Sequence, residues 1–298
     1  MTDIQADEYW AKKGDVELFV FRKRLADETG QPVLFLVHGS SFCGPTGFDL
    51  QVPGRDDYSL MDRFAEAGFD VWTMDHEGYG RSSRTDGNSD IASGVEDLKA
   101  GFEIVTRETG AGSALFYGSS SGALRAAAFA EARPDAVRRL VLDAFVWTGK
   151  DAPTLIKRAE NLAYFRTHNT RPVDRAFFES IFTRDKPGTS EQIVAETLAE
   201  TELQYGDTVP TGTYLDMCAN LPVVDPEKIS CPVMIVRGEH DGVATEEDLM
   251  AFFRLLPNMD KQFCIFAGQA HVTPLGLNRH RFWHAMEAFL TLPDRVDK

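Results

Sequence analysis

Short apolar runs alternate with amphipathic stretches along most of this 298-residue chain. Six runs have the length and apolar character of strands, and four stretches between them have helical spacing. The strand-like runs are residues 32–37, 69–74, 113–117, 137–142, 232–236 and 262–266, and the helical stretches are 58–67, 89–109, 246–256 and 278–290. Runs that are apolar throughout are typical of parallel strands covered on both faces. The alternation therefore predicts an α/β fold with a mostly parallel central sheet flanked by helices.

Two segments depart from this alternation. Residues 8–13 and 16–22 flank a Gly-Asp turn, which predicts a β-hairpin at one edge of the sheet. Residues 147–227 show helical periodicity interrupted by prolines and contain no convincing strand. We therefore expect a core formed by residues 1–146 and 228–298, with a helical insertion at 147–227.

Composition and charge narrow the set of partners. The chain has 46 acidic residues against 31 Lys and Arg, a formal net charge of −15. This excess opposes binding to polyanions, so we expect a small-molecule substrate rather than nucleic acid or an anionic membrane surface. The acidic N-terminal segment is unlike a signal peptide, and no apolar segment approaches the length of a membrane span, which favours a cytoplasmic location.

The cysteines and glycines give no signal for a metal or a cofactor. The four cysteines lack C-x-x-C spacing, which favours reduced thiols over a disulfide framework or a zinc site. They are Cys43, Cys218, Cys231 and Cys264. His280 and His284 lie four residues apart but lack the acidic partners of a metal motif. Gly78 and Gly80 are spaced too closely for a dinucleotide fingerprint, so no cofactor is expected.

The most informative stretch joins the strand at 113–117 to an alanine-rich segment that reads as a helix. Between them the chain contains Gly118-x-Ser120-x-Gly122, which predicts a sharp turn from strand to helix. Small flanking residues are needed where a Cβ atom would collide with neighbouring backbone. Ser120 is then presented at the carboxyl end of the strand, in front of the positive end of the helix dipole. This is a position suited to a nucleophile.

A serine hydroxyl needs a base within hydrogen-bond reach, and a carboxylate usually orients that base. Asp241 follows the predicted strand at 232–236, and His271 follows the strand at 262–266. The carboxyl ends of parallel strands meet at one edge of a sheet, so both residues are expected on the same edge as Ser120. Asp143 also ends a strand and is the alternative acid.

Several residues near these positions carry similar side chains but have other expected roles. Ser119 and Ser121 flank Ser120 but lie one step from the centre of the turn. His240 adjoins Asp241, and a partly exposed helix face is the expected role for His280 and His284. Residues 38, 75 and 76 are expected to shape turns; they are His38, Asp75 and His76.

Five motifs in this order resemble the α/β-hydrolase superfamily over nearly the whole chain. They are His38-Gly39, Asp75-x-x-Gly78-Tyr79-Gly80-Arg81-Ser82, Gly118-x-Ser120-x-Gly122, Gly238-x-x-Asp241 and the late His271. The resemblance implies that Ser120 is the nucleophile, His271 the general base and then acid, and Asp241 the residue that orients it. It also implies an oxyanion hole formed by the backbone N–H groups of Ser40 and Ser121, and a cap formed by the insertion.

The insertion carries residues that would set substrate preference if it is a cap. One hypothesis is that an arginine of its first half binds a substrate carboxylate, and the other is that these arginines lie on a solvated surface. The arginines are Arg158, Arg166, Arg171, Arg175 and Arg184. Its aromatic residues either line an apolar pocket or form the core of the cap; they are Tyr164, Phe165, Phe177, Phe178 and Phe182.

These features together favour a cofactor-free serine hydrolase that cleaves a small carboxylic ester through an acyl-enzyme on Ser120. The resemblance leaves open a hydrolase of carbon–carbon bonds in ring-cleavage products, because His38-Gly39-Ser40 and the following loop are similar to that branch. Lactone, thioester or amide hydrolysis would use the same groups. A non-catalytic ligand-binding protein on the same scaffold is the alternative from a different class. Serine at position 120 argues against haloalkane dehalogenases and epoxide hydrolases, which have aspartate there.

Overall fold

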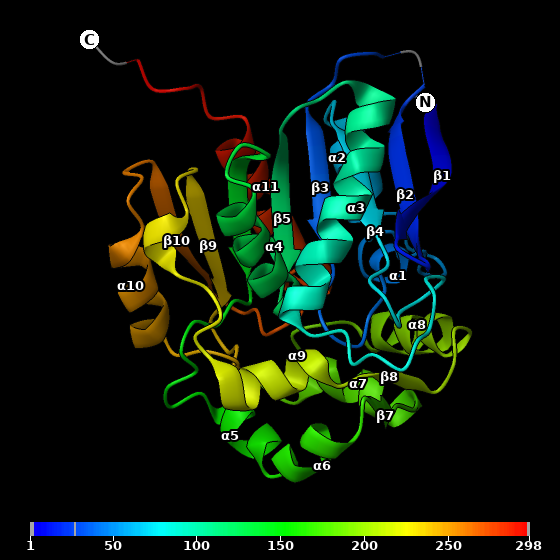
Figure 1. Cartoon of the computed structure of the whole chain (residues 1–298), viewed down its shortest axis with the longest axis vertical. Coiled ribbons are helices and arrows are strands. Elements are labelled where there is room, and N and C mark those ends of the chain that lie inside the picture. The colour runs from blue at the N-terminus through cyan, green and yellow to red at the C-terminus, as the bar shows by residue number, and fades with distance from the viewer. Residues whose placement is uncertain (1–2, 27, 297–298) are drawn as a thin grey trace.

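An eight-stranded sheet lies at the centre of the computed structural model, which describes residues 3–26 and 28–296 (Figure 1). The strand order is β1-β2-β4-β3-β5-β6-β9-β10. Strands β1 and β2 form the predicted hairpin, β2 pairs antiparallel with β4, and every other pair in this sheet is parallel. The strands are β1 (Ile4–Lys13), β2 (Val16–Leu25), β3 (Val33–Val37), β4 (Asp70–Met74), β5 (Ala114–Ser119), β6 (Val137–Asp143), β9 (Val233–Gly238) and β10 (Lys261–Phe266). The predicted mostly parallel sheet is confirmed.

Helices cover both faces of this sheet. Successive side chains of a strand point to opposite faces. Phe35 and Val37 of β3 therefore belong to one buried cluster, which includes residues of α3, α4 and α10, while Leu34 and Leu36 belong to the other, which includes residues of α2 and α11. In Figure 1, α3 and α4 cross the sheet on the side of the viewer. The helices are α2 (Leu60–Glu66), α3 (Ile91–Thr109), α4 (Ser121–Ala132), α10 (Glu246–Leu255) and α11 (Arg279–Leu290). Each fully buried side chain of this size stabilises the fold by about 1.5–3 kcal/mol.

The segment between β6 and β9 lies across one end of the sheet, below it in Figure 1. It contains α5 (Pro153–Ala159), α6 (Leu162–Thr167), β7 (Thr170–Pro172), α7 (Arg175–Thr183), α8 (Gln192–Leu203), β8 (Thr208–Pro210), α9 (Gly212–Leu215), a π-helical turn (Asp216–Asn220) and a 3-10 turn (Pro226–Lys228). The expectation of no strand here is wrong, because β7 and β8 form a small antiparallel pair. Three-residue strands that each end in proline are too short to show an alternating pattern. The division into core and cap stays a prediction.

This segment is fixed to the rest of the molecule by buried polar contacts. The carboxylate of Glu202 on α8 accepts the backbone N–H of Cys43 at 2.8 Å, in the loop that carries the short helix α1 (Gly44–Phe48). The carboxylate of Asp216 accepts the N–H of Ile91 at 2.8 Å, the first residue of α3. That helix is also capped by Asp90 and ends at Gly110, which has φ of 73°. Within the described residues, no helix combines the length and apolarity needed to cross a membrane.

Glu202 makes the stability of the fold dependent on pH. Burial raises the pKa of Glu202 to about 8 from 4.5, although the Cys43 N–H opposes this rise. Because the folded-state pKa is raised, the favourable contribution is fully present below pH 4.5 and is lost as the pH rises through about 8. We expect Glu202→Gln to become more stable than the wild type by about 1–3 kcal/mol at pH 8.5, with little difference at pH 4.5. Urea unfolding at both pH values measures this.

The control for this prediction is Glu200→Gln on the same helix, whose side chain is 63% exposed. The difference in unfolding free energy between Glu200→Gln and the wild type should be the same at both pH values. If the Glu202→Gln and wild-type midpoints change together with pH, the buried carboxyl does not titrate as described.

Candidate active site

The turn between β5 and α4 holds Ser120 in an unusual backbone conformation, with φ of 58° and ψ of −126°. A Cβ atom on Gly118 would lie 2.5 Å from the carbonyl oxygen of Gly122. One on Gly122 would lie 2.2 Å from the carbonyl oxygen of Val37, on the neighbouring strand β3. These contacts are too short for any real Cβ, so only glycine permits the turn to pack against β3. The predicted strand, turn and helix are all present.

Three side chains from separate strand ends meet at this turn. The Nε2 atom of His271 lies 3.1 Å from the Oγ atom of Ser120, and its Nδ1 atom lies 3.0 Å from Oδ1 of Asp241. An ionised carboxylate only accepts, so the Nδ1–H group donates to Asp241 and leaves Nε2 free to accept the proton of Ser120. His271 and Asp241 are both buried, at 7% and 3% exposure. The three side chains therefore form a continuous hydrogen-bonded chain in the order Ser120, His271, Asp241.

Asp241 is held in its ionised form. Burial by itself would raise its pKa, but His271 and the N–H of Val243, 3.0 Å from Oδ1, together lower the pKa below its usual value. A carboxylate that stays ionised can stabilise positive charge on the imidazole ring.

Asp143, the alternative acid, has other partners. Its Oδ2 atom accepts the hydroxyl of Tyr117 at 2.8 Å, and burial raises its pKa to about 7. Within the described residues, no hydrogen bond joins Asp143 to His271. The structure therefore brings Asp241, and not Asp143, against the imidazole.

The remaining histidines lie outside this chain of contacts. His240 is 3.6 Å from Glu239, and His280 is exposed and lies 2.9 Å from Asp57. His284 is exposed on α11. None of the three is positioned near Ser120 by a hydrogen bond within the described part of the chain.

Ser40 and Ser121 lie together beside Ser120. Their Oγ atoms are 2.8 Å apart, and Oγ of Ser40 is also 2.6 Å from Oγ1 of Thr213, a residue of the insertion. Gly39 permits this approach, because a Cβ there would lie 2.7 Å from the carbonyl oxygen of Ser119. Across residues 3–26 and 28–296, the backbone N–H groups of Ser40 and Ser121 donate no hydrogen bond. Both are available to an acceptor.

His38 organises the loop that carries Ser40. Its Nε2 atom accepts the N–H of His76 at 2.9 Å, so its Nδ1–H group is the one that donates to the carbonyl oxygen of Gly39 at 2.8 Å. Burial, followed by the neighbouring His76, holds the pKa of His38 well below its usual value, so the ring is neutral. Asp75 accepts the N–H groups of Gly44 and Arg81 at 2.8 and 2.9 Å. Both residues shape turns, as the sequence indicates.

A pocket opens next to Ser120 and His271. Its apolar lining, called its apolar side below, is formed by Phe42, Phe48, Ile181, Val272, Pro274 and Leu275. The insertion adds Arg158, Arg184 and Tyr214 to the lining. None of the five aromatic residues singled out in the insertion lines the pocket. Phe178 and Phe182 instead pack with Cys43 and Tyr58, between the insertion and the loops of the sheet.

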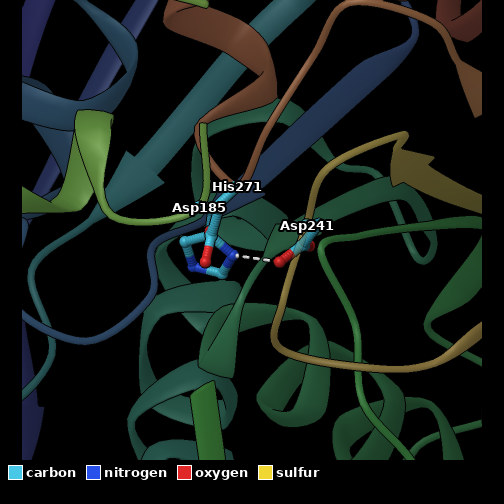
Figure 2. A group of neighbouring side chains, drawn as sticks. All are labelled: Asp185, Asp241 and His271. Atoms are coloured by element: carbon cyan, nitrogen blue, oxygen red, sulfur yellow. Dashed lines mark hydrogen bonds and ion pairs between the residues drawn. The ribbon is translucent and has the colours of Figure 1, made fainter. Parts of the chain in front are cut away.

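Asp185 is a neighbour of the imidazole that the sequence did not reveal. One ligand-type atom from each of Asp185, Asp241 and His271 lies within 4.8 Å of the other two, and in Figure 2 Asp185 overlaps the imidazole ring that the dashed line joins to Asp241. Such a group could in principle hold a metal ion, but both nitrogens of His271 already have partners, so coordination would break one of these hydrogen bonds. Asp185 lies in an irregular stretch after α7, where no strand end or motif marks it.

Comparisons with known proteins agree with this fold. A family model described as serine aminopeptidase, S33, matches residues 54–275. A 2-hydroxy-6-oxononadienedioate/2-hydroxy-6-oxononatrienedioate hydrolase of Burkholderia vietnamiensis (strain G4 / LMG 22486) is 35% identical over 121 residues, which cover 38% of this chain and 36% of that protein. The match thus spans about a third of the length of this relative.

Solved structures resemble the chain over nearly its whole length. E-2-(acetamidomethylene)succinate hydrolase superposes with a TM-score of 0.70 at 19% identity, covering 96% of this chain and 99% of the other. A thermophilic esterase from Thermogutta terrifontis, solved with malate bound, gives a TM-score of 0.67 at 21% identity, covering 96% and 98%. At these identities the likeness concerns the fold.

The close packing at the turn generates a prediction about stability. Gly122→Ala would place a methyl group against backbone atoms of β3, which cannot move aside, so we expect a loss of about 1–3 kcal/mol or more in unfolding free energy. Gly112→Ala is the control, because a Cβ there has nothing within 4 Å. Denaturant unfolding measures both. Equal effects of the two changes would contradict the steric argument.

Proposed function

This chain belongs to the α/β-hydrolase superfamily, in the family described as serine aminopeptidase, S33, and on that premise we propose that it cleaves a small carboxylic ester through an acyl-enzyme on Ser120. The observation that carries the proposal is the hydrogen-bonded chain from Ser120 through His271 to Asp241, which opens onto a pocket. A base in contact with a serine, and a buried carboxylate in contact with that base, form the arrangement that activates a hydroxyl group.

In the first step, Oγ of Ser120 attacks the ester carbonyl carbon while its proton passes to Nε2 of His271. The carbonyl oxygen becomes negatively charged and accepts the backbone N–H groups of Ser40 and Ser121. The imidazolium then gives its proton to the leaving alcohol as the carbon–oxygen bond breaks. The acyl group stays on Ser120.

In the second step, water attacks the acyl carbon and gives a proton to His271, and the same proton returns to Ser120 as the carboxylic acid leaves. Acid–base catalysis by a histidine typically contributes about 10²–10⁴-fold, and each donor to the oxyanion about 10²–10³-fold. The two effects are of similar size, so the proposal needs both. His38 supports stabilisation of the oxyanion, because its hydrogen bond to the Gly39 carbonyl orients the peptide group that also carries the N–H of Ser40.

We propose that the insertion acts as a cap that selects the substrate, which we expect to be a small molecule. The support is its share of the pocket lining, which includes Arg158, Ile181, Arg184 and Tyr214. The apolar side of the pocket suits a short acyl chain.

A second candidate is hydrolysis of a carbon–carbon bond next to a carbonyl group. The match to the Burkholderia vietnamiensis hydrolase favours it. A panel of an ester, a lactone, an amide and a diketone, all assayed on the wild type and on Ser120→Ala, compares these reactions directly.

The assignment of the nucleophile is tested by Ser120→Ala. Removal of the attacking oxygen should reduce kcat by at least about 10⁴-fold and abolish labelling by a fluorophosphonate, while circular dichroism shows an unchanged fold. Ser119→Ala is the matched control and should lose far less activity. A pure Ser120→Ala protein that still turns over ester would reject the assignment, and a wild type that does not react with the probe would favour a non-catalytic binding protein.

The two candidate acids are distinguished by amide substitutions. Asp241→Asn removes the acceptor that fixes the Nδ1–H form of His271, so we expect kcat to fall by about 10²–10⁴-fold. Asp143→Asn keeps an acceptor for the Tyr117 hydroxyl and should change kcat by less than about tenfold. Steady-state kinetics on one ester gives both values. A larger loss for Asp143→Asn would reverse the assignment.

A further inference from the structure

The five arginines of the insertion fall into two groups in the structure. Arg175 pairs with Glu179 and Glu200 on the surface, and Arg166 is exposed on α6. Arg158, Arg171 and Arg184 are instead gathered around Tyr214 at the pocket. The hypothesis of a solvated surface therefore describes the first group and not the second.

Tyr214 is enclosed between two guanidinium groups. The Cζ atom of Arg158 lies 3.8 Å from the centre of its ring, and that of Arg171 lies 4.2 Å from it. Stacking of this kind orients both cations without neutralising them. Arg171 also donates to Oγ of Ser41 at 2.5 Å, and its buried Nε has no hydrogen-bond partner.

Few acidic groups balance these cations. Within residues 3–26 and 28–296, neither Arg158 nor Arg171 forms an ion pair, and the hydrogen bond of Arg158 is a weak one to the sulfur of Met217 at 3.6 Å. Arg184 lies 3.5 Å from Asp185, so one carboxylate faces three guanidinium groups. Asp241, the other nearby acid, is taken up by His271. Arg171 is buried and Arg158 is half-buried, while Arg184 is exposed at the pocket. Charges that are withdrawn from water are normally paired, so the two inner cations favour an anion at this place.

The pKa of Tyr214 agrees with an excess of positive charge from the nearby arginines. Burial by itself would raise its pKa, but Arg171, Arg158 and then Arg184 lower the pKa to about 7. The positive charge at this pocket contrasts with the whole chain, which has a formal net charge of −15. A positive pocket in such an acidic protein focuses attraction for a small anion at this place.

We propose that Arg158 and Arg184, beside the Tyr214 hydroxyl, bind a free carboxylate of the substrate. Arg158 and Arg184 line the same pocket as Ser120 and His271, whereas Arg171 stands behind Tyr214 as a positioning residue. The substrate class is then an ester that also carries a carboxylate, such as a monoester of a dicarboxylic acid. The apolar side of the pocket holds the carbon chain between the two groups. This substrate class rests on the proposed hydrolase function.

The test compares anionic and neutral esters of matched shape. Monomethyl glutarate and methyl pentanoate differ by a carboxylate on the acyl side, and 3-(butanoyloxy)propanoate and propyl butanoate differ by one on the alcohol side. We expect the wild type to have the higher kcat/KM for the anionic member of at least one pair. In that pair, Arg158→Gln should reduce the preference by about 10–100-fold, since a charge-assisted hydrogen bond has this worth. No preference in either pair would overturn the proposal.

Two further variants guard against a folding artefact. Arg184→Gln should also reduce the preference, and Arg166→Gln, which changes an exposed arginine of the same insertion, should leave it as in the wild type. Thermal unfolding reports whether each variant is folded. An equal loss of preference in Arg158→Gln and Arg166→Gln would assign the effect to overall charge and reject the site.

Binding without turnover separates the carboxylate site from the proposed reaction. Glutarate should raise the melting temperature of Ser120→Ala, the neutral glutaramide should not, and the double variant Ser120→Ala with Arg158→Gln should lose the response to glutarate. Glutarate binding in a protein that hydrolyses no ester would retain the anion site and reject the esterase. Hydrolysis of esters with no response to glutarate and no charge preference would retain the esterase and reject the site.

Discussion

The close contact between the β5–α4 turn and strand β3 is the constraint on which the rest of the site depends. Gly122 allows the backbone of the turn to lie against the carbonyl of Val37, and this contact holds Ser120 at positive φ at the end of β5. From that position its hydroxyl meets His271, which a loop beyond β10 supplies. Parallel pairing from β3 to β10 sets the distance between these strand ends. The spacing of the strands thus determines the hydrogen-bond geometry between Ser120 and His271.

Residues that follow strand ends were predictable, because one rule about parallel sheets places them together. Ser120, Asp241 and His271 follow β5, β9 and β10, and the structure brings their side chains into contact. Their catalytic roles stay predictions. Position alone did not separate Asp241 from Asp143, because Asp143 ends β6 and Asp241 follows the end of β9 at the same edge. Asp241 was preferred on the resemblance. The choice between them depends on a loop conformation that directs one carboxylate to the imidazole and the other to Tyr117.

The insertion was less predictable, because no such rule fixes where its side chains point. Arg158 and Arg175 look alike in sequence, yet one lines the pocket and the other forms surface ion pairs. Asp185 and Tyr214 have no motif that marks them, and the packing of short helices alone brings Asp185 near His271 and Tyr214 to the pocket. The pair β7 and β8 was missed for a related reason, since three residues are too few to show periodicity.

The line of hydroxyl groups from Thr213 through Ser40 to Ser121 joins the insertion to the sheet side of the molecule. Thr213 belongs to the insertion, while Ser40 lies in the loop after β3 and Ser121 is the first residue of α4, next to Ser120. Displacement of α9 would remove a partner from Ser40 and disturb the loop next to it. A chimaera that combined this sheet with the insertion of a relative would therefore change the hydrogen bonds next to Ser120 as well as the lining of the pocket.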